Sequence, residues 1–218
     1  MTPPRPLEVR RLGRVPYREA WALQQALVAE RLAGTIPDTL LLLEHDPVIT
    51  LGRAGSRASL LHDEAALARE GVELVHSDRG GDATWHGPGQ VVGYAILDLR
   101  PDWKDVRRFV HALEQTMVDA CADFGVAVGR VPGAPGVYVD AHRKIGAIGA
   151  RFTRWISHHG FALNVNPNLA GFRLIIPCGL RDKGVTSLEA ELGRPVAVDA
   201  VMDRLAVHLA AQFGREVA

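Results

Sequence analysis

Cysteine and lysine are both scarce in this sequence. Only two of the 218 residues are cysteines, Cys121 and Cys178, and only three of the 25 basic residues are lysines. So few cysteines exclude a disulfide-stapled scaffold and a cysteine-rich metal domain. Any chemistry that needs a thiol or an amine therefore has few candidate residues.

Long apolar runs and a net charge are also absent. The apolar runs are too short to cross a membrane, and residues 1–15 hold no apolar signal-peptide core. The 25 acidic residues balance the 25 basic ones, so no overall field attracts nucleic acid or an anionic membrane. We expect one globular domain over residues 1–218, in the cytoplasm, with neither a nucleic acid nor a membrane as partner.

Helix and strand patterns are mixed along the chain. Helical spacing of apolar residues, ended by Gly34 and Gly125, predicts helices at 17–33, 63–70 and 105–124, and a last helix capped by Asp199. Short apolar or alternating runs predict strands at 39–45, 72–77, 90–99, 126–128, 136–139, 144–152 and 155–163. Neighbouring strands often lack a helix between them, which favours an α/β fold with a mixed β-sheet flanked by helices.

The densest polar segment is Arg79-Gly80-Gly81-Asp82-Ala83-Thr84-Trp85-His86-Gly87-Pro88-Gly89-Gln90. Its four glycines allow sharp turns and let a ligand approach the backbone amides closely. A structural turn would explain the glycines, but the polar or aromatic residue at nearly every other position favours a ligand-binding loop. The segment matches neither a Walker A loop nor a dinucleotide fingerprint.

The two cysteines differ in context. Cys121 lies on the apolar face of the 105–124 helix and is expected to be a core residue. Cys178 lies between Pro177 and Gly179, where it is either a thiol nucleophile at a strand end or a buried turn cysteine.

Among the lysines, Lys104 and Lys183 lie in charged loops and are expected to be solvated, whereas Lys144 lies in a strand pattern. Strand alternation places Lys144, Gly146 and Ile148 on one face, and Ile145, Ala147 and Gly149 on the other. A lysine can lose its proton when it is desolvated, whereas arginine effectively cannot. Lys144 is therefore the candidate amine.

Adjacent histidines and a basic stretch complete the candidate features. His158 and His159 are expected to point to opposite faces of a strand, which disfavours a shared metal ion. A thiol–imidazole pair of Cys178 with His86 or His159 stays open. Residues 141–181 contain no acidic residue but six basic ones, Arg143, Lys144, Arg151, Arg154, Arg173 and Arg181, which form either a solvated face or a docking surface for an acidic partner.

Five segments resemble the motifs of the lipoyl(octanoyl) transferases in order and spacing: RGGDATWHGPGQ, KIGAIGAR, HGFALNV, PCGL and VTSL. Trp85 stands where Tyr or Phe is common and Leu180 where Ile is common, and neither change affects a reactive group. The resemblance implies the biotin- and lipoate-protein ligase fold and a cofactor-free, metal-free reaction of a monomer. The implied donor is octanoyl-acyl carrier protein, and the implied acceptors are the lipoyl domains of 2-oxoacid dehydrogenases and the glycine cleavage H protein.

The resemblance also implies residue roles. Cys178 corresponds to the cysteine that carries the acyl thioester, and Lys144 to the lysine that activates it. The acyl-binding regions correspond to Arg79, Gly80, Gly81, Asp82, Ala83, Thr84, Trp85, His86, Ala147, Ile148, Gly149, Gly160, Phe161 and Ala162.

Elementary chemistry limits what this pair can do. Ionising Cys178 in advance gains only a few-fold in rate, because a thiolate of lower pKa is a weaker nucleophile. Positioning and stabilisation of the oxyanion must supply the rest. Lys144 acts either as an ammonium that favours the thiolate or as a neutral amine that takes the thiol proton, and Arg143 could be its cationic neighbour.

Three other functions stay open at this point: an ATP-dependent ligase, a cysteine hydrolase with a histidine base, and a non-catalytic carrier-binding module. The PCGL cysteine and the lack of a recognisable phosphate loop favour the transferase over the ligase.

Overall fold

The computed structural model of the chain describes residues 4–175 and 184–218. The strands of its large sheet are β1 (Arg5–Arg14), β2 (Asp38–Glu44), β6 (Gln90–Ile96), β7 (Gly129–Val131), β8 (Ala134–Tyr138), β9 (Arg143–Thr153), β10 (Ile156–Asn164), β11 (Gly184–Val185) and β12 (Arg215–Val217). The helices are α1 (Tyr17–Ala33), α2 (Glu64–Arg69), α3 (Val106–Asp123), α4 (Leu188–Leu192) and α5 (Val198–Gln212).

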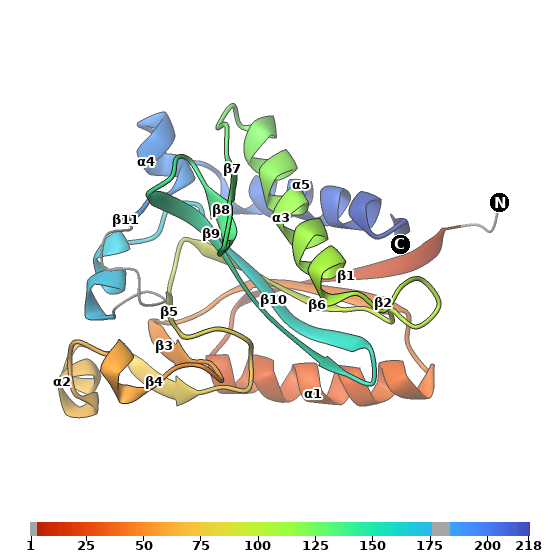
Figure 1. Cartoon of the computed structure of the whole chain (residues 1–218), viewed down its shortest axis with the longest axis horizontal. Coiled ribbons are helices and arrows are strands. Elements are labelled where there is room, and N and C mark those ends of the chain that lie inside the picture. Colours follow the sequence, from red (N-terminus) through yellow and green to blue (C-terminus); the bar gives the residue numbers. More distant parts are fainter. Residues whose placement is uncertain (1–3, 176–183) are drawn as a thin grey trace.

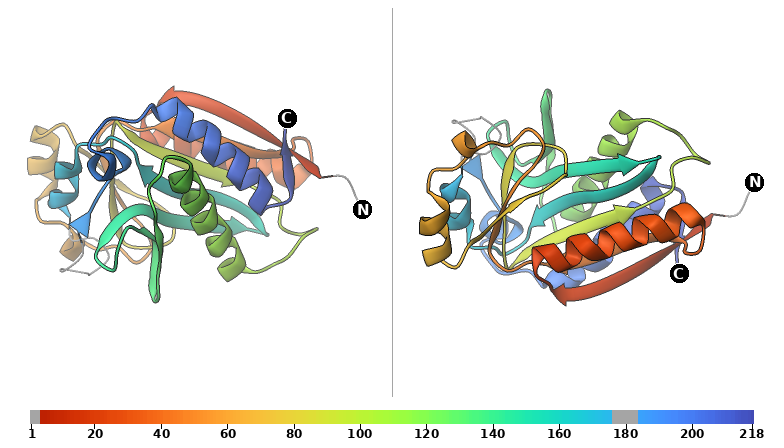
Figure 2. Two further views of the ribbon diagram at one scale, coloured as in Figure 1. Left: turned by 90° about the horizontal axis from the view of Figure 1, so that it is seen from above. Right: turned by 90° about the horizontal axis from the view of Figure 1, so that it is seen from below.

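The large sheet is mixed, as the sequence predicts. Its nine strands run in the order β12-β1-β2-β6-β10-β9-β8-β7, with β11 paired to β9. Strand β1 is parallel to both β2 and β12, whereas β6, β10, β9 and β8 pair antiparallel. Helix α1 covers one face of the sheet, and α3 and α5 cover the other (Figures 1 and 2).

Two apolar cores hold the sheet between these helices. Phe109 of α3 and Leu205 of α5 belong to the larger core, and Leu27 of α1 packs with Leu41 in the smaller one. Burying each such side chain is worth about 1.5–3 kcal/mol. The apolar helix faces therefore fix the layer order.

A second sheet has three strands, β3 (Val48–Leu51), β4 (Glu73–His76) and β5 (Ala83–His86), in the order β4-β3-β5. A third core beside it includes Leu67 of α2 and Trp85 of β5. The short helices η1 (Arg57–Ser59) and η2 (Leu169–Leu174) lie in the neighbouring segments. Strand β5 differs from the prediction, because it occupies part of the segment predicted to be a ligand-binding loop.

The two long helices confirm the spacing argument. Helix α1 has the predicted bounds and ends at Gly34, whose φ is +76°. Helix α3 begins after Asp105, whose side chain accepts a hydrogen bond from the Arg108 amide at 3.0 Å.

Two local predictions are wrong. Residues 126–128 form no strand, and β7 begins at Gly129 instead. Asp199 does not cap α5, because the helix already begins at Val198 and its N-cap residue is Ala197. Asp199 lies in the first turn, where a negative charge still complements the helix dipole.

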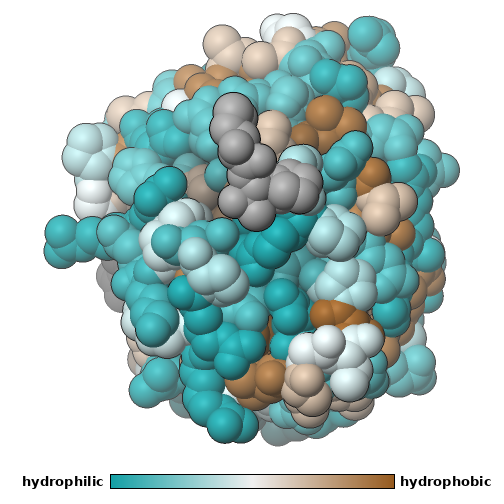
Figure 3. All heavy atoms as spheres, turned by 90° about the vertical axis from the view of Figure 1, so that its right-hand side faces the viewer, coloured by the Kyte–Doolittle hydropathy of each residue, from teal (hydrophilic) through white to brown (hydrophobic). Residues whose placement is uncertain are grey.

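The outer surface is mostly polar on the face shown in Figure 3, where apolar residues form scattered patches. Of the helices in the described part of the chain, none combines the length and apolar character needed to cross a bilayer.

Candidate active site

A cavity of about 310 Å³ lies where the two sheets meet, within the size range of small-ligand sites. Strand β5 and the loop before it contribute to its lining, as do β6, β9 and β10 of the large sheet. Its lining includes Arg79, Gly81, Asp82, Ala83, Thr84, His86, Ala147, Ile148, Gly149, Gly160, Phe161 and Ala162. Three motif segments that are far apart in the sequence thus meet at one cavity.

Two of the predicted binding residues do not line this cavity. Gly80 lines a separate cavity of about 290 Å³, and its amide donates to the Ala150 carbonyl at 3.1 Å. Trp85 is buried in the core of the small sheet, where its ring centroid lies 5.3 Å from that of Phe172. Both residues therefore support the wall rather than form it.

Small side chains on β10 and β9 make room for the cavity. Opposite residues of antiparallel strands share a face of the sheet. The resulting cross-strand rows are Tyr94, Gly160 and Gly149, and Val92, Ala162 and Ala147. Ala162 and Ala147 keep the second row small and leave space beside it. In the first row, a Cβ atom on Gly160 would collide with the Gly93 carbonyl, and one on Gly149 would lie 3.0 Å from the Gly80 carbonyl oxygen, so these two glycines let neighbouring backbone pack closely.

Lys144, near the start of β9, also lines the cavity. Its Nζ donates to the Pro135 carbonyl at 3.0 Å and lies 5.1 Å from the centroid of the Tyr138 ring. Lys104, by contrast, is exposed, as predicted.

The face on which Lys144 lies differs from the prediction. Alternation separates it from Ala147, yet both residues line the cavity. The pairing of β8 with β9 contains a register shift. Ile145 and Ile148 both contact the larger core, although alternation places them on opposite faces. This local irregularity puts the lysine on the cavity side.

Arg79 is buried and braces the turn that leads into β5. Its Nε donates to Thr50 Oγ1 at 2.9 Å, and its Nη2 donates to the carbonyls of Thr50 and Asp82, both at 2.6 Å. Gly52 packs against the same turn, where a Cβ atom would lie only 2.4 Å from the Gly81 carbonyl oxygen. The turn therefore depends on the Arg79 guanidinium and on a glycine at position 52.

Two buried histidines lie beside each other near the cavity. His86 Nδ1 is 2.6 Å from Gln90 Oε1, and His45 Nε2 is 2.7 Å from the Tyr94 hydroxyl. Burial lowers the pKa of His86 to about 3 and the pKa of His45 to about 4. So weak a base accepts a thiol proton poorly at neutral pH, which argues against a thiol–imidazole pair with His86.

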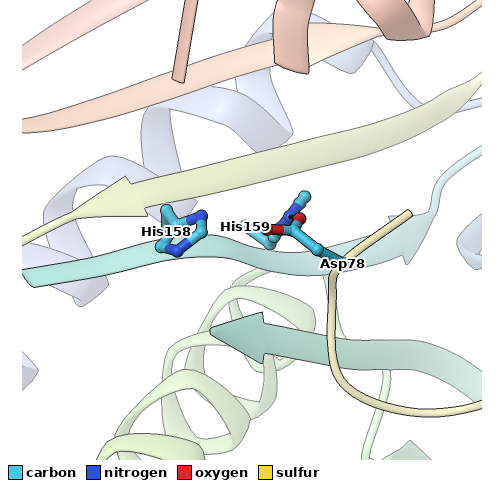
Figure 4. A group of neighbouring side chains, drawn as sticks. All are labelled: Asp78, His158 and His159. Carbon is cyan, nitrogen blue, oxygen red and sulfur yellow. Dashed lines mark hydrogen bonds and ion pairs between the residues drawn. The ribbon is translucent and has the colours of Figure 1, made fainter. Parts of the chain in front are cut away.

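The prediction that His158 and His159 point to opposite faces is wrong. Their rings stack with centroids 5.2 Å apart and planes 29° apart. His159 has a φ of +54°, in the left-handed region that residues with side chains rarely adopt. Figure 4 shows both imidazoles with Asp78, whose Oδ1 lies 2.7 Å from His159 Nε2.

The structure describes one of the two cysteines. Cys121 is buried in the larger core, as predicted, and burial raises the pKa of its thiol to about 12. Cys178 and Lys183 lie outside the described residues. Ile175 and Val185, on the two sides of that segment, both line the cavity.

Acidic residues partly neutralise the basic stretch. Arg143 forms ion pairs with two carboxylates, and Arg151 with one. Arg154 and Arg173 are exposed and form no ion pair with another described residue. Arg181 lies outside the described residues. Arg143, predicted as a cationic neighbour of the lysine, is thus largely offset.

Sequence reasoning missed four of the aromatic residues of the cavity, although it included Phe161. Tyr17, Tyr94, Tyr138 and Phe172 line it from four separate elements. No local motif connects these elements, so only the folded chain brings the rings together.

Comparison with known proteins places the chain in a family. Residues 16–210 match the family described as the lipoyl protein ligase A/B catalytic domain. A protein of Myxococcus xanthus named Octanoyltransferase is 46% identical over 215 residues, which are 96% of this chain and 60% of that protein. An Octanoyltransferase of Solibacter usitatus is 50% identical over 210 residues, 96% of this chain and 94% of that protein. A bi-partite lipoate protein ligase from Thermoplasma acidophilum shares the fold with a TM-score of 0.74 at 15% identity, over 97% of this chain and 86% of that chain. The chain therefore belongs to the lipoyl protein ligase A/B catalytic-domain family.

Proposed function

We propose that this chain is an octanoyltransferase that moves an octanoyl group from acyl carrier protein to a lysine of a lipoyl domain. The observation that carries the proposal is the similarity, at 46% and 50% identity over most of the chain, to proteins named Octanoyltransferase. The meeting of three motif segments at one cavity supports it.

The cavity suits an acyl chain. Val92, Ile148, Phe161, Ala162 and Ile175 contribute apolar surface to its lining. Burying about six methylenes at about 0.8 kcal/mol each is worth roughly 5 kcal/mol of binding free energy. The predicted acyl-binding residues are in this proposal the wall of the octanoyl site, with Gly80 and Trp85 as its supports.

In the first half-reaction, the Cys178 sulfur attacks the carbonyl carbon of the donor thioester. The Lys144 amine takes the thiol proton, the bond from carbon to the carrier sulfur breaks, and the proton passes to that departing thiolate. The products are an octanoyl thioester on Cys178 and the free carrier thiol. The position of Lys144 on the cavity supports this role.

In the second half-reaction, the acceptor lysine attacks the Cys178 thioester as a neutral amine. The new amide bond forms as the bond from carbon to the Cys178 sulfur breaks. Lys144 accepts the proton that the amine loses and returns it to the Cys178 thiolate, so the free thiol is restored. One amine thus serves both steps, and the chain works as a monomer without a cofactor.

Intact-mass analysis tests the proposal. The chain is incubated with octanoyl-acyl carrier protein in the absence of ATP. We expect one octanoyl adduct, which disappears in Cys178→Ala and persists in the matched control Cys121→Ala. An adduct that forms only with ATP would indicate a ligase, and rapid release of free octanoate would indicate a hydrolase.

A further inference from the structure

His158, His159 and Asp78 form a cluster that the proposed acyl transfer does not use. One nitrogen of each imidazole and one oxygen of the carboxylate lie within 4.8 Å of one another (Figure 4). We propose that this cluster binds a divalent transition-metal ion of the zinc class. The proposal does not depend on the proposed acyl transfer.

The donor set fits such an ion. Two imidazoles and one carboxylate are the protein ligands of many three-ligand zinc sites, which keep further positions for water. Within the described part of the chain, Nδ1 of His158 and Nδ1 of His159 are buried and have no hydrogen-bond partner. Leaving a buried polar atom unsatisfied is costly. An ion bound through Nδ1 of His158 would give that ring a second partner besides Thr153 Oγ1, which lies 3.3 Å from its Nε2.

The backbone brings the two rings together at a cost. The positive φ of His159 interrupts the alternation that would otherwise separate it from His158. Such conformations persist only where the surroundings enforce them. Here the His159 amide donates to Gln24 Oε1 of α1 at 2.7 Å, which anchors the irregular position.

Binding an ion requires only small side-chain movements. Zinc lies about 2.0–2.2 Å from nitrogen and oxygen ligands, so two ligands of one tetrahedral ion are about 3.4 Å apart. The His159–Asp78 contact of 2.7 Å must open by roughly 0.7 Å. The widest pair of ligand atoms must close by at most about 1.4 Å. The partly exposed Asp78 side chain can supply much of this movement.

Arg151 opposes the ion. Its Nε lies 3.3 Å from Asp78 Oδ2, and its Nη1 donates to the Asp78 carbonyl at 3.2 Å. The Arg151 cation offsets the negative charge of Asp78, although it lies beside Oδ2, whereas His159 contacts Oδ1. Removing the arginine charge should therefore strengthen metal binding, whereas removing a ligand should weaken it.

The cluster is also within reach of solvent. Asp78 lines the separate cavity of about 290 Å³, whereas His159 lines the proposed octanoyl cavity. An ion can therefore enter from the side of Asp78 without passing through the octanoyl cavity.

Metal titration of the full chain tests the proposal. All variants carry Cys178→Ala, so that the motif thiol cannot compete for the ion, and the remaining thiol, Cys121, is buried in the larger core. We expect one equivalent of Zn²⁺ to bind in competition with a chromophoric chelator. We also expect Co²⁺ to give the visible absorption of a low-symmetry site. His158→Gln and Asp78→Asn should each weaken Zn²⁺ binding at least 10-fold and remove the Co²⁺ bands. Circular dichroism checks that both variants are folded.

Two further variants sharpen the result. His208→Gln is the matched control, because His208 Nε2 also lies 2.7 Å from a carboxylate oxygen, of Asp123, but no second imidazole joins that pair in the described structure. It should bind Zn²⁺ like the parent. Arg151→Gln should bind Zn²⁺ at least five-fold more tightly. Absence of binding, or unchanged affinity in His158→Gln, would overturn the proposal while leaving the octanoyl-adduct assay unaffected.

Discussion

Ala162→Leu tests whether the cavity holds the acyl chain. Ala162 is 5% exposed, lines the cavity and lies between Val92 and Ala147 in one of the two cross-strand rows. Leucine adds three carbon atoms at this point, and a cavity of about 310 Å³ has room for them. The substitution should therefore shorten the site without straining the fold.

The size of the effect follows from the methylenes that the new side chain displaces. Three displaced methylenes at about 0.8 kcal/mol each cost about 2.4 kcal/mol, or roughly 60-fold in kcat/KM for an octanoyl donor. Ala162→Val adds two carbons and should cost about 1.6 kcal/mol, or roughly 15-fold. For a donor that is three carbons shorter, Ala162→Leu should lose little kcat/KM. The preferred acyl chain of this variant therefore moves towards the pentanoyl group.

The assay is a donor series from butanoyl to decanoyl acyl carrier protein, with transfer to a lipoyl domain followed by mass. Thermal unfolding of each variant is the control, and it should show no loss of stability, because the new side chain fills apolar space. An equal loss for all chain lengths, or an unchanged chain-length profile, would refute the assignment of this cavity to the acyl chain.

Other substitutions probe the amine, the buried imidazole and the packing beneath the site. Lys144→Ala should lower single-turnover transfer by about 10²–10⁴-fold, and Lys144→Arg should not restore it, because a guanidinium cannot accept the proton. Near-normal rates in either variant would contradict the base role. The pKa of His45 is about 4 in the folded chain and about 6.5 when unfolded. The unfolded chain therefore binds the proton more readily, so the free energy of unfolding keeps its full value above pH 6.5 and falls by up to about 3 kcal/mol towards pH 4. Urea unfolding from pH 7 to 4 should be less pH-dependent in His45→Asn, and parallel curves would disprove this. In Gly93→Ala, the new Cβ would lie 2.3 Å from the Phe161 ring, so we expect a loss of about 1–3 kcal/mol that Phe161→Leu partly relieves. Additive losses in the double-mutant cycle would exclude this coupling.

Local sequence patterns predicted those helices and strands that bury apolar residues in a regular spacing. Helices α1 and α3 match the ranges read from apolar spacing closely, because each buries a helical stripe against the sheet. The central strands β2 and β6 were likewise visible as apolar runs, and β10 as a strand-like stretch. The mixed sheet was predicted because neighbouring strands along the chain often lack a helix between them.

Non-local pairing explains what the sequence did not show. Strand β5 pairs with β3, so residues 83–86 become a strand only because residues 48–51 lie beside them. Their own composition, rich in neighbouring glycines, is typical of a loop. The four missed aromatic residues of the cavity escaped notice for the same reason, since they come from separate elements.

Two of the errors at the site share one physical cause. Lys144 lies beside a register shift of the β8–β9 pairing, and His159 has a positive φ within β10. Because side chains alternate with a period of two, one irregular residue moves a side chain to the opposite face. The alternation of residues in the sequence cannot reveal such an irregular position, because contacts with neighbouring elements of the fold enforce it. The strained backbone of His159 costs free energy, of order 1–3 kcal/mol, that a purely structural strand has no reason to keep. The irregular strand positions are therefore where we look for reactive side chains, Lys144 for the proposed acyl transfer and His159 for the proposed metal site.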